Sequence, residues 1–315
     1  MFFLKDSSFF DAEEVNNILK RNPLSLISRY ERLFSNELSL IAENIISERV
    51  KLVMLTGPSS SGKTTTSHKL VEALREAGSD AVVVSLDNFY KDRDDIPDGR
   101  DGKKDFESID ALATDVLEEK LAGLAAGETV LMPRFDFHTA KRIDNDHELK
   151  LGENKIAILE GIHALNFKVL ELLPEGSFTT MYISAHADFR KDGKTVLQKS
   201  DIRFLRRMVR DRATRNADAD LTFSLWDMVM RGEELYINPN RARAKIRVST
   251  TFPYDPAALR EGALPLLATI APSSPYYEKA AALSEALLRF EPLDLSLLPS
   301  NALIREFVGG SKYYD

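Results

Sequence analysis

The sequence predicts an α/β protein with a three-layer core, in which helices cover both faces of a parallel sheet, and with helical extensions at both ends. Two observations predict the core. Short apolar runs typical of buried strands occur at residues 50–56, 81–86, 155–160, 179–184 and 245–250. Helical stretches lie between them, at 62–77, at 109–126 and from about 200 to 236. Strands that alternate with helices at this spacing favour a parallel sheet.

The two ends of the chain have a different pattern. Residues 1–48 are expected to be helical, with a break at Asn22-Pro23. In the second part of this segment, apolar residues recur at spacings of three and four and form one stripe: Ile27, Tyr30, Phe34, Leu38, Ile41 and Ile45. After Pro253 we expect no strand and two helical patches, at 277–290 and 302–307. The predicted organisation is therefore an extension at 1–48, a core at 49–252 and an extension at 253–315.

Composition and charge limit the function. The chain of 315 residues has 49 acidic and 42 basic residues, a net charge of −7, which argues against general binding to nucleic acid or to an anionic membrane. It has no cysteine, which excludes disulfides, thiolate metal sites and cysteine nucleophiles. No apolar run reaches the roughly 18 residues of a membrane span, and the N-terminus lacks the pattern of a signal peptide. We expect a cytoplasmic protein whose partner is a small molecule, and whose helical ends either make contacts in a homo-oligomer or cover sheet edges.

The strongest functional signal is the segment GPSSSGKT at residues 57–64, which matches the phosphate-loop pattern G-x-x-x-x-G-K-[ST] between a strand and a helix. The two glycines let backbone N–H groups fold around phosphate oxygens, and the following helix directs its positive end at them. Lys63 is expected to reach the outer phosphates and the Thr64 hydroxyl to ligate Mg²⁺. The expected nucleotide-binding residues of this segment are Gly57, Pro58, Ser59, Ser60, Ser61, Gly62, Lys63, Thr64 and Thr65.

Two other classes of phosphate-loop protein are disfavoured. GTPases usually also carry D-x-x-G and N-K-x-D, but no aspartate stands three residues before a glycine here. Asn154-Lys155 continues as Ile156-Ala157, so the second motif is absent as well. The chain also lacks the second signature that a nucleic-acid motor would be expected to carry.

Two carboxylates are expected at the sheet edge that holds the loop. Asp87 follows the strand at 81–86 and Glu160 ends the strand at 155–160, and ligands bind at the carboxyl ends of strands in such sheets. Asp87 is placed to accept the proton of an attacking hydroxyl, and a turn or N-cap role is the alternative. Glu160 stands where phosphate-loop proteins commonly keep an acid near Mg²⁺, and a carboxylate facing water is the alternative. His163 is interpreted as a packed side chain.

Six arginines and one aspartate gather within residues 203–215. Such a concentration in an acidic chain indicates an anionic partner, and the phosphates of a nucleotide fit it. A solvated helix face is the alternative. A nucleic-acid patch is disfavoured because aromatic residues are scarce within the segment.

In this order, the motifs resemble those of the uridine kinase and phosphoribulokinase family of P-loop kinases. The resemblance covers about 50–252 and rests on GPSSSGKT, SLDNFY (85–90), DFESIDA (105–111), MPRFDF (132–137), ILEGIHALN (158–166) and RFLRRMVRDRATR (203–215). The helical tail NALIREFVGGS (301–311) is similar to that of the long bacterial nucleoside kinase type, without its N-terminal TGS module. The resemblance implies a P-loop kinase core that uses ATP and Mg²⁺ to phosphorylate the 5′-hydroxyl of a nucleoside, uridine or cytidine by default.

The resemblance also implies roles for single residues. Asp87 would be the catalytic base, and Lys63, Arg207 and Arg210 would complete the catalytic set. Arg207 would contact sugar and phosphates, while Arg210 and Arg215 would belong to a lid over the triphosphate. Thr64 and Glu160 would hold the metal. The residues that would bind the acceptor are Asp87, Tyr90, Glu107, Phe135, Phe137 and Arg207.

Three positions depart from the family's pattern. Glu107 stands where the family usually has an aspartate that holds the ribose hydroxyls. Ala140 and Leu225 replace a histidine and a glutamine that read the base. Hydrogen-bonding sites discriminate strongly between ligands, so a different hydroxyl compound, such as a sugar phosphate or another nucleoside, is an open alternative. A nucleotide-binding regulatory protein without catalysis is a third, which the presence of Lys63 and Asp87 disfavours.

Overall fold

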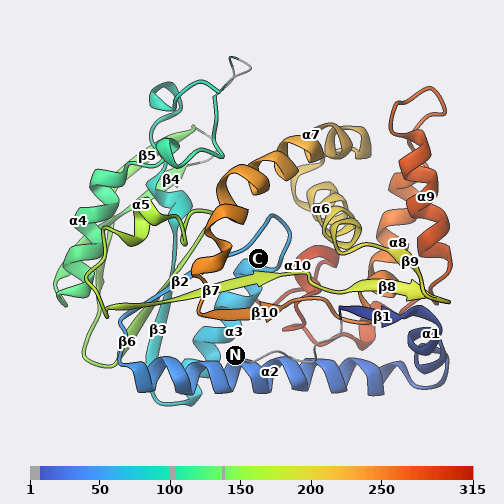
Figure 1. The fold of residues 1–315 in the computed structure, drawn as a ribbon, viewed down its shortest axis with the longest axis horizontal. Helices are drawn as coiled ribbons and strands as arrows, with labels where there is room; N and C mark the ends of the chain where they lie inside the picture. The colour runs from blue at the N-terminus through green and yellow to red at the C-terminus, as the bar shows by residue number, and fades with distance from the viewer. Residues whose placement is uncertain (1–7, 100–101, 103, 137–138, 315) are drawn as a thin grey trace.

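The computed structural model describes residues 8–99, 102, 104–136 and 139–314, and it confirms the predicted α/β class. Five parallel strands form the central sheet in the order β10-β7-β2-β6-β3 (Figure 1). They are β2 (Leu52–Thr56), β3 (Asp80–Ser85), β6 (Lys155–Glu160), β7 (Phe178–Ser184) and β10 (Ile246–Ser249). Each of the five predicted apolar runs is therefore a strand of one sheet, and their carboxyl ends meet at one edge.

The two faces of the sheet are covered separately, which confirms the three layers. Side chains alternate along β2: Val53 and Leu55 belong to one buried cluster, and Leu52 and Met54 belong to the other. The first cluster includes side chains of α2 (Pro23–Glu48) and α3 (Lys63–Glu76), and the second includes side chains of α4 (Thr114–Ala125) and α5 (Phe167–Leu170). The sheet is thus buried on both faces, as its continuous apolar strands require.

The N-terminal extension is helical except at its start. After α1 (Ala12–Arg21), the Asn22 side chain accepts a hydrogen bond from the Ser25 backbone and caps α2, whose first residue is Pro23. The predicted apolar stripe of α2 is buried apart from Tyr30, which is half-buried. The prediction of helix throughout was wrong at β1 (Phe9–Asp11), which pairs in parallel with β8 (Asp188–Lys191). Helix α2 packs against α3. The C-terminal half of α2 lines a cavity together with β10, which is the strand at one edge of the sheet.

Two antiparallel hairpins lie outside the main sheet. One joins β8 to β9 (Lys194–Leu197), and the other joins β4 (Thr129–Asp136) to β5 (Lys141–Lys150). The sequence did not indicate the second hairpin, because β5 reads KRIDNDHELK and is exposed along nearly its whole length. A strand with no buried face has no alternation of apolar and polar residues to reveal it.

The single long helix predicted from about 200 to 236 is wrong, because two helices occupy this part of the chain. Helix α6 (Lys199–Arg215) ends at Asn216, whose positive φ of 51° stops the helix, and Asp218 then caps α7 (Ala219–Gly232). The predicted helix at 109–126 is shorter as well, since a 3₁₀ turn (Ile109–Ala111) precedes α4.

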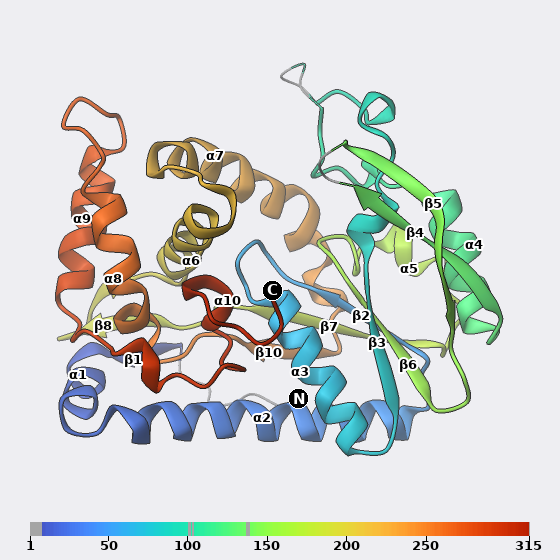
Figure 2. The ribbon, with the colours of Figure 1, turned by 180° about the vertical axis from the view of Figure 1, so that it is seen from behind.

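The C-terminal extension contains α8 (Asp255–Leu267), α9 (Tyr277–Leu288) and the short α10 (Arg305–Val308). The two predicted helical patches match α9 and α10, whereas α8 was not predicted. Leu283, Leu303 and Phe307 of this extension are buried in the same cluster as α2 and α3. Figure 2 shows α10 beside the beginning of α3 and below α6.

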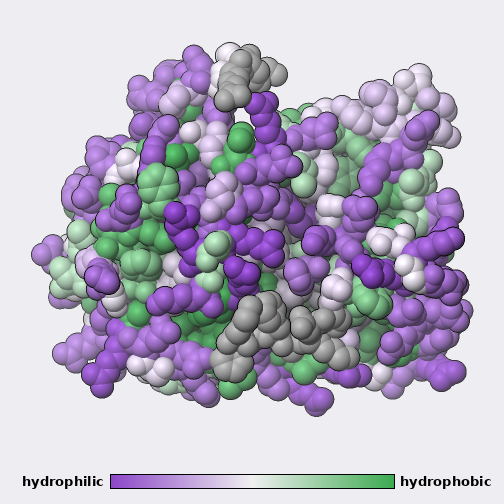
Figure 3. Space-filling view, in the orientation of Figure 1, coloured by the Kyte–Doolittle hydropathy of each residue, from purple (hydrophilic) through white to green (hydrophobic). Residues whose placement is uncertain are grey.

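The surface agrees with the composition. Polar and charged side chains cover most of the face in Figure 3, and apolar residues appear there in small patches. Within the described ranges, no helix combines the length and the apolar character that crossing a membrane would need.

Candidate active site

The phosphate loop connects β2 to α3 at the carboxyl edge of the sheet, which is the context that the motif predicts. A Cβ atom on Gly57 would lie 2.3 Å from the carbonyl oxygen of Ile183, so only glycine fits this turn. Gly62 has a φ of +84° and directly precedes α3. The Lys63 ammonium donates to the carbonyl oxygens of Gly57 (3.0 Å) and Pro58 (3.4 Å), which closes the loop on itself.

Helix α6 lies against this loop through three of its arginines. Arg203 Nε donates to the Ser59 carbonyl oxygen (3.0 Å), and Arg207 Nη1 donates to the Ser59 hydroxyl (3.0 Å). Arg206 Nη1 donates to the Ser60 carbonyl oxygen (3.4 Å). The alternative of a solvated helix face is wrong for Arg203 and Arg206, which are both buried.

Arg203 and Arg206 are held by carboxylates that the sequence did not indicate. Arg203 Nη2 lies 2.7 Å from a Glu233 carboxylate oxygen, just after α7. Arg206 Nη2 lies 2.7 Å from Asp255 Oδ2, in α8, and also donates to the Thr250 carbonyl oxygen (2.6 Å). Both arginines therefore hold the backbone of the phosphate loop, and each is paired with a carboxylate.

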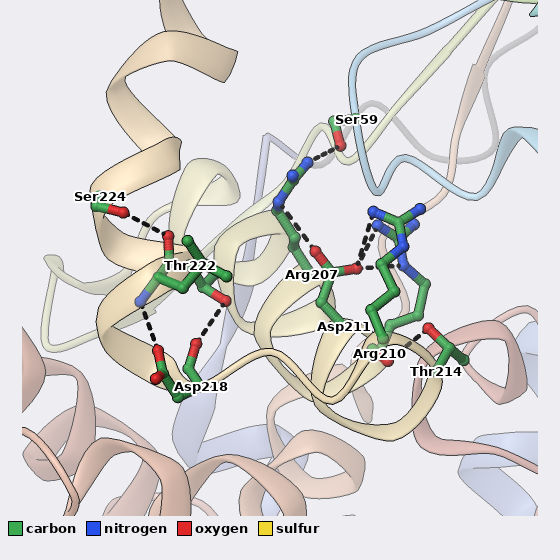
Figure 4. A network of polar contacts seen from close by, with 10 residues as sticks. Ser59, Arg207, Arg210, Asp211, Thr214, Asp218, Thr222 and Ser224 are labelled. Carbon is green, nitrogen blue, oxygen red and sulfur yellow. Dashed lines mark hydrogen bonds and ion pairs between the residues drawn. The ribbon is translucent and has the colours of Figure 1, made fainter. Parts of the chain in front are cut away.

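Asp211 pairs with three arginines of α6, and Figure 4 shows its contacts with Arg207 and Arg210. Its buried carboxylate lies 3.3 Å from Arg207 Nε and accepts hydrogen bonds from Arg210 Nε (3.0 Å) and Nη2 (2.8 Å). Arg215 Nη1 lies 3.6 Å away, and the Arg215 side chain is 60% exposed at the end of α6. One aspartate thus fixes the Arg207 and Arg210 guanidinium groups beside the loop and leaves Arg215 largely in solvent.

The two predicted carboxylates lie beside Lys63. Asp87 is in the 3₁₀ turn Leu86–Phe89 that directly follows β3, and Glu160 is the last residue of β6, paired in register with Ser85. Burial raises the pKa of the Asp87 carboxyl, and the Lys63 ammonium opposes this shift. Burial also raises the pKa of Glu160 to about 7, and the nearby negative charge of Asp87 adds to the effect. The buried Oε2 atom of Glu160 has no hydrogen-bond partner among the described residues.

A third carboxylate, Glu107, belongs to the same electrostatic cluster. Burial raises its pKa, the positive charges of Lys63 and Arg207 lower it, and the Asp87 charge raises it. A Cβ atom on Gly232 in α7 would lie 3.2 Å from Glu107 Oε2, so this glycine leaves just enough space for the carboxylate. Glu107 and Asp87 thus lie close enough to Lys63 to share its positive charge.

Aromatic residues form a wall beside these carboxylates, in which Tyr90 and Phe135 are buried and Phe106 is exposed. The Tyr90 ring packs edge-on against Phe135 (5.6 Å) and Phe106 (6.2 Å), and the Tyr90 hydroxyl donates to the Phe106 carbonyl oxygen (3.0 Å). The backbone N–H of Phe135 donates to Asn88 Oδ1 (3.3 Å). Phe137, also expected in this pocket, lies outside the described residues.

Ala140 and Leu225 stand at the two positions where the resemblance implies polar residues that recognise the base. Ala140 has a positive φ of 52°, packs against the apolar cluster on the Phe135 side of the sheet, and accepts a hydrogen bond from the Arg93 backbone at its carbonyl oxygen. Leu225 is half-buried on α7. Neither side chain carries a polar atom, so neither can hydrogen-bond a base.

His163 is buried behind the Glu107 loop, in agreement with its interpretation as a packed side chain. Its ring packs edge-on against Tyr236 (5.8 Å), and Tyr236 donates from its hydroxyl to Asp105 Oδ2 (2.7 Å). Burial lowers the pKa of His163 to about 4, although the nearby backbone at Glu107 and Ser108 opposes the shift. His163, Tyr236 and Asp105 thus support the loop that carries Glu107, a role that the sequence did not reveal.

The buried histidine predicts an acid sensitivity. The folded protein holds His163 neutral down to about pH 4, while the unfolded chain protonates it near pH 6.5, so the unfolding free energy must fall as the pH falls between these values. We expect His163→Phe to remove about 3 kcal/mol of this loss, measured by urea unfolding at pH 7 and pH 4. The same replacement at the exposed His147 is the control. Equal acid sensitivity of wild type and His163→Phe would contradict the prediction.

Together, the glycine loop between strand and helix, its lysine and the carboxylates at the sheet edge define a P-loop kinase. The model of the Phosphoribulokinase / Uridine kinase family matches residues 52–253, and the chain belongs to this family. It is 31% identical over 161 residues to a uridine kinase of Leuconostoc citreum, which is 51% of this chain and 68% of that relative. It is 28% identical over 201 residues to a uridine kinase of Clostridium botulinum, 63% of this chain and 87% of that relative.

A solved structure, described as that of a "Possible Uridine Kinase" from Bacillus stearothermophilus, is also similar. It has a TM-score of 0.46 and 16% identity to this chain, over 68% of this chain and 98% of that one.

Proposed function

We propose that the protein transfers the γ-phosphoryl group of ATP to the 5′-hydroxyl of a nucleoside, with uridine and cytidine as the first candidates. The observation that carries this proposal is the placement of Asp87, Glu107 and Glu160 in one cluster with Lys63 of the phosphate loop. The curated relatives described above are uridine kinases, which supports the choice of acceptor.

The residues at the loop fit Mg²⁺ and ATP. The backbone of residues 57–65 and the Lys63 ammonium would cradle the phosphates. Thr64 and Glu160 would hold the metal, because the buried Oε2 atom of Glu160 has no protein partner in the described part of the chain and would gain one in a cation. Mg²⁺ held there would supply positive charge to the phosphate oxygens.

The acceptor would lie between the carboxylates and the aromatic wall. Asp87 would accept the proton of the attacking hydroxyl, a role that its raised pKa suits, since a general base works best when its pKa is near the operating pH. Glu107 would hold the sugar hydroxyls, and Tyr90, Phe135 and Phe137 would border the base. Arg207 would contact sugar and phosphates.

Two more arginines would act on the triphosphate. Arg210, oriented by Asp211, would stabilise the negative charge that develops during transfer. The largely exposed Arg215 would close over the nucleotide from the end of α6.

A second candidate acceptor follows from Ala140 and Leu225, which carry no polar group to recognise uracil or cytosine. A pocket without such groups discriminates poorly among bases, and an acceptor such as a sugar phosphate or another nucleoside is therefore a specific alternative.

The function is tested by measuring ADP release with Mg²⁺-ATP against a panel of nucleosides, sugars and sugar phosphates. We expect turnover of uridine or cytidine, and we expect Lys63→Ala to weaken both ATP binding and turnover because the outer phosphates lose their ammonium partner. Lys20→Ala removes one exposed charge of α1, where it pairs with Glu291 away from the loop, and is the control for Lys63→Ala. Turnover of another compound alone would favour the second candidate. ATP binding without turnover of any compound would favour a regulatory protein, and normal activity of Lys63→Ala would exclude the proposed role of the loop.

A further inference from the structure

The C-terminal segment 303–314 lies on the N-terminal turn of α3, directly beside the phosphate loop (Figure 2). Leu303 covers Gly62 so closely that a Cβ atom there would lie 2.9 Å from the Leu303 side chain. Glu306 Oε2, in α10, accepts hydrogen bonds from the Thr65 backbone N–H (3.2 Å) and the Thr65 hydroxyl (2.7 Å). The Tyr314 hydroxyl lies near the side chain of Thr64, and this neighbour opposes the rise of the Tyr314 pKa that burial causes.

These contacts involve the same groups of Thr64 and Thr65 that would bind the phosphates and the metal of a nucleotide. The backbone N–H of Thr65 is one of the free donors in the first turn of α3, and phosphate loops direct such donors at the phosphates of the nucleotide. Thr64 carries the hydroxyl proposed to hold Mg²⁺. Glu306 is an anion bound where an anionic phosphate would bind, and the Tyr314 side chain lies beside the hydroxyl of Thr64.

The negative charges of Glu306 and of a triphosphate make it unfavourable for both to lie at the phosphate loop at the same time. The Glu306 charge already acts on Glu160 and contributes to raising the Glu160 pKa. A triphosphate at the loop would bring further negative charge against Glu306, in a site where burial strengthens repulsion. The Thr65 N–H has one hydrogen, so Glu306 and a phosphate compete for it directly.

The segment is attached by two kinds of contact. Phe307 is buried beneath the Arg206 guanidinium (5.0 Å), which anchors α10 in the apolar cluster. The last residues are held by more exposed contacts: the Tyr313 ring stacks on His68 (5.3 Å) and its hydroxyl donates to Glu72 Oε2 (2.9 Å). The tail, residues 309–314, can thus leave α3 by breaking exposed contacts. Phe307 meanwhile stays buried and keeps α10 in place.

We propose that residues 303–314 form a C-terminal gate in which Glu306 and Tyr314 close the phosphate site until ATP displaces them. This proposal rests on the proposed function, because it assigns ATP to the same loop. Binding of ATP and closure of the gate then exclude each other at Thr64 and Thr65, and a partner or modification that draws the tail away would activate the protein.

The gate predicts that removing the Glu306 carboxylate tightens ATP binding. We expect Glu306→Ala to bind Mg²⁺-ATP about tenfold more tightly than the wild type in calorimetric titration, since one charge-assisted hydrogen bond no longer competes. Glu306→Gln retains an acceptor but not the charge, so its affinity should fall between the two. Glu285→Gln removes an exposed carboxylate of the same extension, far from the loop in its pairing with Arg289, and should bind ATP as the wild type does. Unchanged or weaker ATP binding in both Glu306 variants would overturn the gate.

A measurement on the wild type avoids any dependence on the variants. Saturation with Mg²⁺-ATP should increase amide hydrogen exchange in residues 309–314, because this tail leaves α3 while Phe307 keeps α10 in place. Equal or stronger protection would overturn the gate. If wild type binds ATP and turns over an acceptor but the tail stays protected, only the gate fails. If neither wild type nor the Glu306 variants bind ATP, the proposed function fails and the gate fails with it.

Discussion

Asp87→Asn is expected to lower kcat by about 10² or more while leaving the affinity for Mg²⁺-ATP within about twofold of wild type. The amide keeps the shape of the side chain but cannot take the proton of the acceptor hydroxyl. Because Asp87 follows β3 and is not part of the phosphate loop, we expect the nucleotide contacts of the loop to remain. The test combines single-turnover kinetics with a calorimetric titration of ATP.

The matched control for this prediction is Asp110→Asn. Asp110 is an exposed aspartate of the neighbouring segment, paired at the surface with Lys168 (3.1 Å), and its replacement should leave kcat unchanged. Unchanged turnover in Asp87→Asn would remove Asp87 from the proposed mechanism, whereas equal losses in both variants would point to a general disturbance of this region.

Arg206→Met is expected to destabilise the protein by about 3–5 kcal/mol, because it leaves the buried carboxylate of Asp255 without its cation. Both side chains are completely buried, and Arg206 also donates to the carbonyl oxygens of Ser60 and Thr250. The KM for ATP should rise as well, since the phosphate loop loses a support at Ser60. Urea unfolding measures the first effect, and steady-state kinetics measures the second.

Two further variants test whether the pair itself is responsible. Arg289→Met breaks the surface pair with Glu285 and should cost at most about 1 kcal/mol. Arg206→Met combined with Asp255→Leu removes both charges, and it should recover much of the lost stability, because two apolar groups need no partner. A loss below about 1 kcal/mol in Arg206→Met alone would contradict the prediction.

The sequence predicted the features whose signals are local. Buried strands such as β2 are continuous apolar runs, the stripe of α2 has helical periodicity, and the loop at 57–64 must have its glycines to bend. These patterns depend on nearby residues alone, and the family match at 52–253 agrees with the motifs that follow from them.

The sequence did not reveal pairings between distant segments. The contact of Glu306 with Thr65 spans 241 positions, and the ion pair of Arg206 with Asp255 spans 49, so no window of the sequence contains either. The same reason explains why the sequence did not distinguish the buried arginines of α6 that hold the loop backbone from those that Asp211 holds beside the loop. Their roles depend on which carboxylate each one meets, and three different segments supply Glu233, Asp255 and Asp211.

The position of Asp255 bears on how this chain is divided. The family match ends at residue 253, and the counter-ion of Arg206 comes two residues later, in α8. A polypeptide cut at that boundary would keep every shared motif, yet it would enclose a guanidinium with no carboxylate to neutralise it. Helix α8 thus supplies the counter-ion of an arginine that contacts the phosphate loop, although this helix lies beyond the family match.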